Sequence, residues 1–346
     1  MYHIVPLVKA LEFRPEAVSE LGWLTCMISV KHLSKLYRTP IKGKNFLLDL
    51  FFRKYKTIQA LSDVSFEIGH NELIGFIGPN GAGKTTTLKI LAGILYPTSG
   101  EVRVLNYIPF EKKSDFLKQI SFIMGQRNQL LWDLPAYDTF TLNKEIYDVD
   151  ESSFKKIVDE LSSILHCRHL LQKPVKSLSL GERMKMELIA GLIHQPKIIF
   201  FDEPTIGLDI FSQKIIRDFI KTYQEEYKAT IMLTSHYMED VKELAKRLII
   251  INKGTILYDG KLETIIQKYS RIKTIKITLE DKIDEEILSA IKEPLSCTFP
   301  QVVYQVEKSE LPKIMNFINE KLPYSDLTVE EESIEEIIRS FFKESR

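Results

Sequence analysis

The sequence predicts an α/β fold with a parallel β-sheet, and three short stretches carry this prediction. Apolar runs over residues 73–77, 197–201 and 230–234 have the length and composition of buried parallel strands. Each run is followed by polar or glycine-rich residues and then by a segment with helical periodicity. Strands that alternate with helices in this way are typical of a sheet covered by helices.

The first of these strands leads into a loop that predicts nucleotide binding. Residues 78–85 read GPNGAGKT, which fits the phosphate-loop pattern of Gly, four residues and Gly-Lys-Thr. Glycines allow backbone N–H groups to point at phosphate oxygens, and the following helix adds partial positive charge at its N-terminus. Lys84 would reach the β- and γ-phosphates, and the hydroxyl of Thr85 would ligate Mg²⁺.

The other two strands end in residues suited to hydrolysis. The strand over 197–201 ends in Asp202 and Glu203, and the strand over 230–234 leads to His236. The carboxyl ends of parallel strands form the ligand edge of a sheet. Asp202 suits Mg²⁺ held through water, and Glu203 suits a base that polarises the attacking water. A lone His at a strand end is often structural, but its position at this edge favours a functional role.

Composition excludes several classes of protein. The 346 residues suggest two domains, and Lys+Arg and Asp+Glu are balanced at 47 each, so no overall field favours nucleic acid. Three scattered cysteines show no disulfide or metal spacing, which fits a reducing cytosol. No apolar run approaches the about 20 residues needed to span a bilayer, so a membrane role requires a partner.

The N-terminal part of the chain is interpreted as an extension over 1–27, with Met27 as the hypothetical natural start, followed by an antiparallel β patch. Its strands begin at Ile28 and at Thr57. Tyr37 would stack on adenine, with packing on the sheet as the alternative and Tyr55 as a reserve candidate.

An insertion over 38–56 separates the two strands and mixes apolar residues with six basic residues and one acidic residue. A short amphipathic helix against a membrane or partner and a solvated loop with one apolar side buried are both open.

Downstream of the phosphate loop, strands are expected over 101–105 and 120–124, and the second of these ends at Gly125 and Gln126. Residues 138–172 have helical periodicity and form a helical insert. The sequence LSLGER over 178–183 opens another helix, and a Ser and a Gly at a helix start expose N–H groups to an anion.

Residues 271–346 are predicted to form a small α+β domain with the order βαβαβα, including a capping box over 333–336. For this domain two interpretations remain open: it has a regulatory or dimer-supporting role, or it is an appendage that only packs against the rest of the protein.

The motifs GPNGAGKTT, Gln126, LSLGE, IIFFDEP, GLD and His236, in this order, resemble the nucleotide-binding subunit of an ABC transporter. The resemblance covers residues 28–270, with a helical insert at about 127–180, and implies the P-loop NTPase core of the ABC ATPase type. The segment GQRNQLLWDLPAYDTF and the LSLGE variant look most like exporter ATPases with separately encoded permeases.

The resemblance also implies site roles. Tyr37 would stack on adenine, Gln126 would sense Mg²⁺ and the γ-phosphate, and His236 would contact that phosphate. Asp202 and Thr85 would support Mg²⁺, and Glu203 would be the general base. Across a dimer, Ser179 and Gly181 would bind the γ-phosphate held by the opposite subunit, and Asp209 would contact that subunit. The triphosphate would be bound by Gly78, Pro79, Asn80, Gly81, Ala82, Gly83, Lys84, Thr85 and Thr86.

The chain departs from the family pattern Leu-Ser-Gly-Gly-Gln at Leu180 and Glu182. Glu182 could weaken ATP-driven dimerisation, cap its own helix, or pair with Arg183 or Lys185. The other site residues are present, so the departure does not indicate inactivation.

The resulting prediction is a Mg²⁺-dependent ATPase subunit, peripheral on the inner face of the cell membrane. It would form a homodimer around two ATP molecules and drive an integral-membrane permease, with no nucleic acid partner. Trp132 would line the groove for the permease or pack in the local core. The alternative is a soluble ABC-type ATPase acting on ribosomes or DNA, which usually carries long coiled coils or tandem ATPase domains. A nucleotide-binding regulator without turnover is disfavoured by Glu203.

Overall fold

The computed structural model describes residues 26–41, 54–269, 272–290, 292–332 and 334–344. The chain divides into two compact units, Met1–Gly260 and Lys261–Arg346. The predicted N-terminal extension lies outside the described residues apart from Cys26 and Met27, and so do residues 42–53 of the predicted insertion. The sequence placed the domain boundary at 270–271, whereas the units divide ahead of the helix α10 (Leu262–Tyr269).

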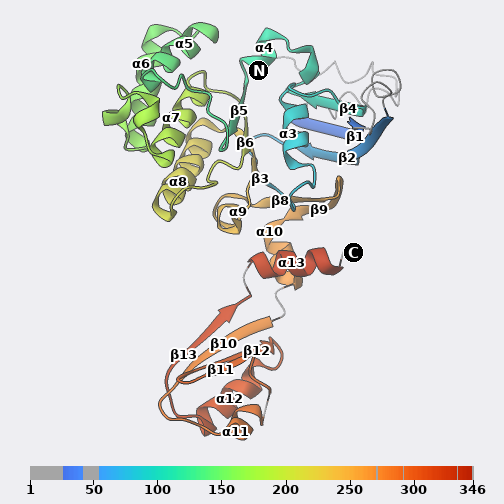
Figure 1. Cartoon of the computed structure of the whole chain (residues 1–346), viewed down its shortest axis with the longest axis vertical. Coiled ribbons are helices and arrows are strands. Elements are labelled where there is room, and N and C mark those ends of the chain that lie inside the picture. Colours follow the sequence, from blue (N-terminus) through green and yellow to red (C-terminus); the bar gives the residue numbers. More distant parts are fainter. Residues whose placement is uncertain (1–25, 42–53, 270–271, 291, 333, 345–346) are drawn as a thin grey trace, which may run out of the picture. The chain divides into compact units, whose positions relative to one another are not determined.

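The core of the first unit is a sheet in the strand order β5-β6-β7-β3-β8-β9 (Figure 1). Its neighbours β5/β6, β6/β7, β7/β3 and β3/β8 are parallel, which confirms the predicted α/β fold class. The inner strands are almost continuously apolar because helices or the antiparallel sheet cover both faces. The strand bounds are β3 Leu73–Ile77, β5 Ile120–Met124, β6 Ile198–Asp202, β7 Thr230–Thr234, β8 Arg247–Asn252 and β9 Thr255–Lys261.

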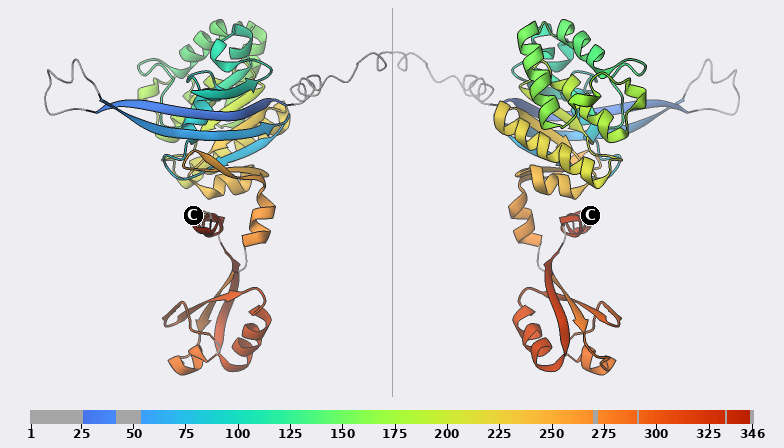
Figure 2. Two further views of the ribbon diagram at one scale, coloured as in Figure 1. Left: turned by 90° about the vertical axis from the view of Figure 1, so that its right-hand side faces the viewer. Right: turned by 90° about the vertical axis from the view of Figure 1, so that its left-hand side faces the viewer.

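The predicted antiparallel patch is a sheet in the order β2-β1-β4, formed by β1 (Ile28–Ile41), β2 (Lys54–Ile68) and β4 (Ser99–Val104). Strands β1 and β2 are longer than expected, because residues 38–41 pair with residues 54–57 and continue the ladder. Figure 2 shows these two strands as a long ribbon that extends beyond the rest of the first unit. Tyr37 lies opposite Ile58 in this ribbon.

A group of helices packs against the central sheet. Helices α5, α6 and α7 lie together at one side of the unit (Figure 1) and share one apolar cluster with α8 and the sheet. Phe140, Phe154 and Leu161 are fully buried in this cluster, and Asp150 caps α6 through the N–H groups of Ser152 and Ser153. The helix bounds are α3 Lys84–Leu91, α4 Ser114–Leu117, α5 Ala136–Ile146, α6 Glu151–Ile164, α7 Leu180–Leu192, α8 Ile210–Tyr227 and α9 Met238–Leu244, with 3-10 turns η1 Pro109–Glu111, η2 Arg168–Leu170 and η3 Val175–Ser177.

The second unit holds an antiparallel sheet in the order β11-β12-β10-β13. Alternate residues Ile275, Ile277 and Leu279 of β10 are buried in its core, as the period-2 pattern predicts. The short strand β11 was not predicted, and the expected capping Ser333 lies outside the described residues. The bounds are β10 Ile272–Leu279, α11 Glu285–Ser289, β11 Ser296–Thr298, β12 Gln301–Glu307, α12 Leu311–Lys321, β13 Tyr324–Glu331 and α13 Ile334–Glu344.

Within the described ranges, no helix combines the length and the apolar character that crossing a membrane requires.

Candidate functional site

The phosphate loop lies between β3 and α3, as the sequence predicts. Gly81 and Gly83 adopt left-handed backbone angles, with φ of 77° and 112°. A Cβ on Gly83 would also lie 2.6 Å from Leu61 Cδ2 and 2.9 Å from the carbonyl oxygen of Ala60. Helix α3 begins without a side-chain cap, so its first N–H groups are available to an anion. The loop is therefore shaped to bind phosphate oxygens through its backbone.

Lys84 is folded back onto this loop. Its Nζ donates hydrogen bonds to the carbonyl oxygens of Gly78 at 2.7 Å and Pro79 at 3.3 Å. Only 6% of its surface is exposed, and burial lowers the pKa of its ammonium group against the opposing charges of Glu203 and Asp202. A cation held at the base of the loop by two neutral carbonyl groups can exchange these partners for phosphate oxygens.

The loop opens into one cavity of about 500 Å³. This volume is in the range of small-ligand pockets. We call it the nucleotide cavity. It is lined by Tyr37, Ile58, Gln59, Ala60, Asn80, Gly81, Gly83, Lys84, Thr85, Thr86, Gln126, Glu203 and His236. Residues from β1, the phosphate loop, and the ends of β5, β6 and β7 therefore meet at one place.

Tyr37 lies on the wall of this cavity, 37% exposed, with the Lys35 ammonium 5.3 Å from its ring centre. The reserve candidate Tyr55 is exposed and does not line the cavity. An aromatic face available to solvent at this position can stack on a base.

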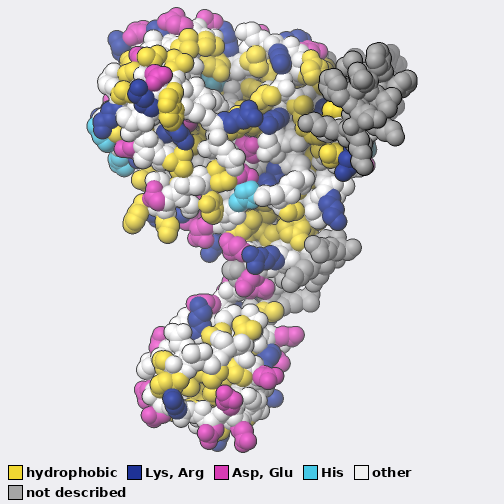
Figure 3. All heavy atoms as spheres, in the orientation of Figure 1, with side chains coloured by type: hydrophobic (Ala, Val, Ile, Leu, Met, Phe, Trp, Pro, Cys, Tyr) yellow, Lys and Arg dark blue, Asp and Glu magenta, His cyan; other side chains and the backbone are white. Residues whose placement is uncertain are grey.

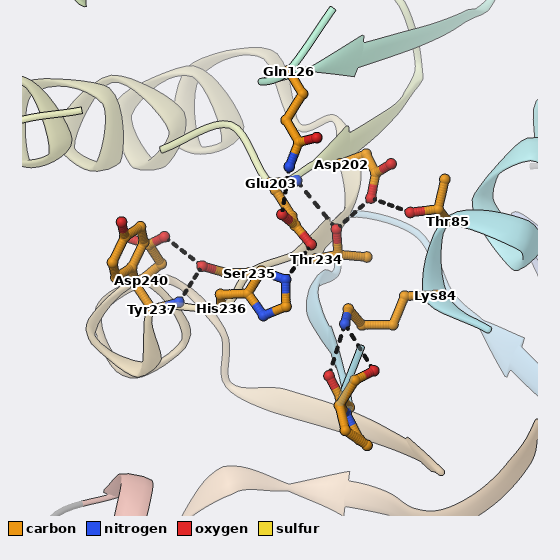
Figure 4. Close-up of polar contacts among 12 residues, drawn as sticks. Lys84, Thr85, Gln126, Asp202, Glu203, Thr234, Ser235, His236, Tyr237 and Asp240 are labelled. Atoms are coloured by element: carbon orange, nitrogen blue, oxygen red, sulfur yellow. Dashed lines mark hydrogen bonds and ion pairs between the residues drawn. The ribbon is translucent and has the colours of Figure 1, made fainter. Parts of the chain in front are cut away.

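Glu203 lies at the centre of a polar cluster (Figure 4). Its Oε1 is 2.7 Å from His236 Nε2, and Gln126 Nε2 approaches its Oε2 at 3.5 Å. The backbone of Glu203 has a φ of 56°, which is strained for a residue with a side chain. Its N–H donates to the carbonyl oxygen and the hydroxyl of Thr234 on β7. The strained backbone is held in place by the neighbouring strand, which aims the carboxylate at the cavity.

Asp202 is positioned by two hydroxyl groups. Thr85 Oγ1 donates to Asp202 Oδ1 at 3.1 Å, and Thr234 Oγ1 donates to the same atom at 2.8 Å (Figure 4). A hydroxyl and a carboxylate beside a phosphate loop fit Mg²⁺, which takes one or two protein oxygens and completes its shell with phosphate and water. Among the described residues, no group of three or more His, Cys, Asp or Glu is placed to hold a metal ion.

Behind the cluster lies a buried carboxylate that the sequence analysis did not identify. Asp240 in α9 is fully buried and accepts hydrogen bonds from Thr205 Oγ1 at 2.5 Å, Ser235 Oγ at 2.6 Å and Arg217 NH1 at 3.1 Å. These three donors come from the loop after Glu203, the residue before His236, and α8. Asp240 therefore ties together the two segments that carry the cavity's acid and histidine. An acid in a first helical turn normally indicates exposure, so the sequence held no clear signal of this role.

The segment LSLGE forms the start of α7. The Ser179 N–H donates to Glu182 Oε2 at 2.9 Å, and the Glu182 N–H donates to Ser179 Oγ at 3.3 Å. This reciprocal pair is a capping box, which confirms the prediction that Glu182 caps its own helix. The hydrogen bond from Ser179 lowers the pKa of Glu182, so the carboxylate stays charged in this role. The hydroxyl of Ser179 acts as an acceptor here and keeps its hydrogen for another partner.

Ser179, Gly181 and Asp209 do not line the nucleotide cavity. They lie together instead, because a Cβ on Gly181 would meet Ser212 Oγ at 2.5 Å and Asp209 Oδ2 at 4.0 Å. Asp209 caps α8 through the N–H of Ser212. The predicted site residues therefore form two separate sets within one chain.

Trp132 is 49% exposed, and the guanidinium of Arg183 lies 5.7 Å from its ring centre. The alternative in which Trp132 packs in the local core is wrong, because half of its surface faces solvent.

A phosphate loop joined to a glutamate–histidine pair at the ends of neighbouring parallel strands defines a nucleotide-hydrolysing P-loop protein. Residues 61–206 match the family model described as ABC transporter. The chain is 35% identical over 217 residues to the ABC transporter ATP-binding protein NatA of Bacillus subtilis, covering 63% of this chain and 88% of NatA. It is 32% identical over 203 residues to the doxorubicin resistance ATP-binding protein DrrA of Mycobacterium tuberculosis, covering 59% and 61% of the two chains.

Among solved structures, the chain resembles the dimeric post-hydrolysis state of the ATP-binding cassette MJ0796 bound to ADP and Pi. The TM-score is 0.57 at 24% identity, over 68% of this chain and 99% of that one. The shared fold and the sequence identity to NatA both indicate the same family. The chain belongs to the family of ABC transporter ATP-binding proteins, and it is an ATPase.

Proposed function

We propose that this chain is the Mg²⁺-dependent ATP-hydrolysing subunit of an export-type membrane ABC transporter. The observation that carries the proposal is the contact of Glu203 with His236 beside the phosphate loop, at 2.7 Å. The names of the relatives NatA and DrrA support the transport assignment, and the resistance function in the name of DrrA supports the export direction. In such a transporter the permease selects the cargo.

In this proposal the protein binds the nucleotide in three places. Tyr37 stacks on adenine, the backbone of residues 78–86 binds the phosphates, and Lys84 exchanges its two carbonyl partners for β- and γ-phosphate oxygens. Thr85 and Asp202 would hold Mg²⁺, which when bound neutralises charge on the phosphate oxygens. The existing hydrogen bond between these two side chains keeps their oxygens together.

The chemical step is assigned to the cluster around Glu203. Its carboxylate orients a water molecule for in-line attack and accepts the proton of that water. His236 holds the carboxylate through Nε2, and the same N–H can shift its hydrogen bond to the γ-phosphate oxygens as charge moves onto them. Gln126 follows the end of β5 and approaches Glu203 at the oxygen that does not contact His236. In this proposal Gln126 connects the site to the helical insert that follows it in the chain.

A second subunit would complete the site. Ser179, Gly181 and Asp209 lie outside the nucleotide cavity of their own chain, and in this proposal they serve a nucleotide on another copy. Ser179 and Leu180 at the start of α7 are exposed, whereas Gly181 is buried, and the free hydrogen of the Ser179 hydroxyl suits a γ-phosphate. We therefore propose a homodimer with two composite sites. The dimeric structure of the cassette MJ0796, which has a similar fold, supports this arrangement.

The permease would bind at a large groove in the first unit, and Trp132, which the sequence suggested for such a groove, does not line it. A cavity of about 660 Å³ is lined by residues of α4, α5, α7 and β5 and of the segment after α3, including Ile94, Leu117 and Ile146. Ile94, Leu117 and Ile146 are exposed apolar side chains that a partner helix would cover. Such a partner would hold the chain on the inner face of the cell membrane.

The decisive test of the chemistry is Glu203→Gln. The variant keeps the size and hydrogen-bonding capacity of the side chain but removes the base, so hydrolysis should fall at least about 100-fold. ATP binding should persist, and the dimer should become more stable in ATP. Glu111→Gln, which changes an exposed acid paired with Lys113, serves as the control. Turnover at the wild-type rate in Glu203→Gln would remove Glu203 from its role.

The alternative is a soluble ABC-type ATPase that acts on ribosomes or DNA. Its discriminating experiment is affinity purification of the full chain from native membranes and from the soluble fraction. The transport assignment expects an integral membrane protein in stable ratio with this chain. Recovery with ribosomes or DNA would support the alternative.

A further inference from the structure

A second cavity opens beside the nucleotide cavity, with a volume of about 290 Å³. We call it the side cavity. Its lining consists of Thr85, Lys89, Met124, Gln126, Arg127, Asp202 and Glu203. Thr85, Gln126 and Glu203 line both cavities. The two cavities therefore meet where the terminal phosphate of a bound nucleotide would be attacked.

The lining of the side cavity combines two acids and two cations. Its acids are engaged, because Glu203 is paired with His236 and Asp202 accepts two hydroxyl hydrogen bonds. Its cations are Lys89, in the last turn of α3, and Arg127, in the loop after β5. Neither of these two side chains has an ion-pair or hydrogen-bond partner in the part of the chain that the structure describes. Figure 3 shows Lys and Arg side chains gathered on this face, between the positions of α3 and β5 in Figure 1.

Hydrolysis would create an anion beside Glu203, which lines both cavities. The water oxygen forms a bond to the γ-phosphorus, the bond from this phosphorus to the bridging oxygen of ADP breaks, and Glu203 takes the proton of the water. Inorganic phosphate then carries between one and two negative charges near neutral pH. ADP still occupies the nucleotide cavity, while the carboxylates of Asp202 and Glu203 repel the new anion. Lys89 and Arg127, which line the side cavity, are the cations that can attract it there.

We propose that the side cavity is the exit route for inorganic phosphate, and that Lys89 and Arg127 form a transient phosphate site along it. A cavity of about 290 Å³ is far larger than the about 15 Å³ that one water molecule requires, so a tetrahedral oxyanion has room. An Arg and a Lys together are the side chains best suited to a phosphate group. The inference rests on the proposed function, because the phosphate that leaves is the product of that reaction.

The test uses the full chain and the double variant Lys89→Gln/Arg127→Gln. Rapid quenching measures the hydrolysis step in a single turnover, and a fluorescent phosphate-binding protein measures release of phosphate. Hydrolysis should proceed at the wild-type rate, whereas release should slow at least about tenfold, the size of one lost charge-assisted hydrogen bond. Lys155→Gln is the matched control, since Lys155 lies on α6 and is paired with Glu151.

A direct binding measurement accompanies the kinetics. The ³¹P line of inorganic phosphate should broaden in the presence of the ADP-bound wild-type chain and should stay sharp with the double variant. The charge-retaining variant Lys89→Arg/Arg127→Lys should restore release toward the wild-type rate. If either the release rate or the line width is unchanged in the double variant, the proposal is overturned. If the wild-type chain hydrolyses no ATP, the proposed function itself fails, so the two failures are distinct.

Discussion

Replacing Glu187 by Gln should change how the stability of this protein depends on pH. Glu187 lies in α7, is 5% exposed, and accepts a hydrogen bond from the N–H of Gln129 at 2.8 Å. Burial raises the pKa of its carboxyl from the usual 4.5 to about 7, against the opposing effects of the backbone N–H groups of Gln129 and Leu130 and the charge of Arg183. Glu187 lines a small pocket, and the other charged residues in the lining of this pocket are Arg127 and Arg183.

The expected magnitude follows from the two pKa values. A gap between 4.5 and about 7, at 1.36 kcal/mol per pH unit, corresponds to about 3 kcal/mol. Within this window the folded protein binds the proton and the unfolded chain does not, so the free energy of unfolding falls as pH rises. Above about pH 7 the carboxyl is ionised in both states, and the free energy of unfolding falls no further from this group. Glu187→Gln cannot ionise but keeps an oxygen that can accept the hydrogen bond from Gln129.

The assay is urea denaturation of wild type and Glu187→Gln at intervals from pH 5 to pH 8. The two proteins should be similar near pH 5, and the variant should become more stable by up to about 3 kcal/mol at pH 8. Glu151→Gln, on the surface of α6, provides the control for removing one negative charge. A stability difference between Glu187→Gln and wild type that stays constant over this range would refute the reasoning.

Two further predictions concern the site. Tyr37→Ala should raise the dissociation constant for ATP about 5- to 150-fold, as expected for a stacking contact of about 1–3 kcal/mol, while Tyr55→Ala should bind ATP like the wild type. Equilibrium binding of a fluorescent ATP analogue checks both, and equal affinities of the two variants would exclude stacking by Tyr37. Asp240→Ala should lower the free energy of unfolding by about 3–5 kcal/mol, because the buried Arg217 loses its hydrogen bond to Asp240 and keeps the one to Glu243. Urea denaturation measures this fall in the free energy of unfolding, and adding Arg217→Met should recover part of it. If nothing is recovered, the destabilisation does not come from the incompletely paired Arg217.

Much of the site is local in sequence and could therefore be predicted. The glycines and Lys84 of the phosphate loop are consecutive, and the strand before them and the helix after them follow from short-range patterns. Glu203 and His236 could be assigned to one edge because both follow buried strands, and parallel strands end on the same side. The capping box of Ser179 and Glu182 was one of three open interpretations of Glu182, and the i, i+3 spacing of the two residues is what allowed it to be proposed from the sequence.

The sequence by itself thus determined the fold class, the nucleotide-binding loop and the ends of the strands, because each depends on residues close together in the chain. Only the tertiary structure decided which charged groups are buried and which are unpaired. Asp240 and Glu187 are held by donors from other segments, and Lys89 and Arg127 share one cavity although separate elements carry them. Burial and pairing of charge arise from packing between distant segments, which no local pattern records.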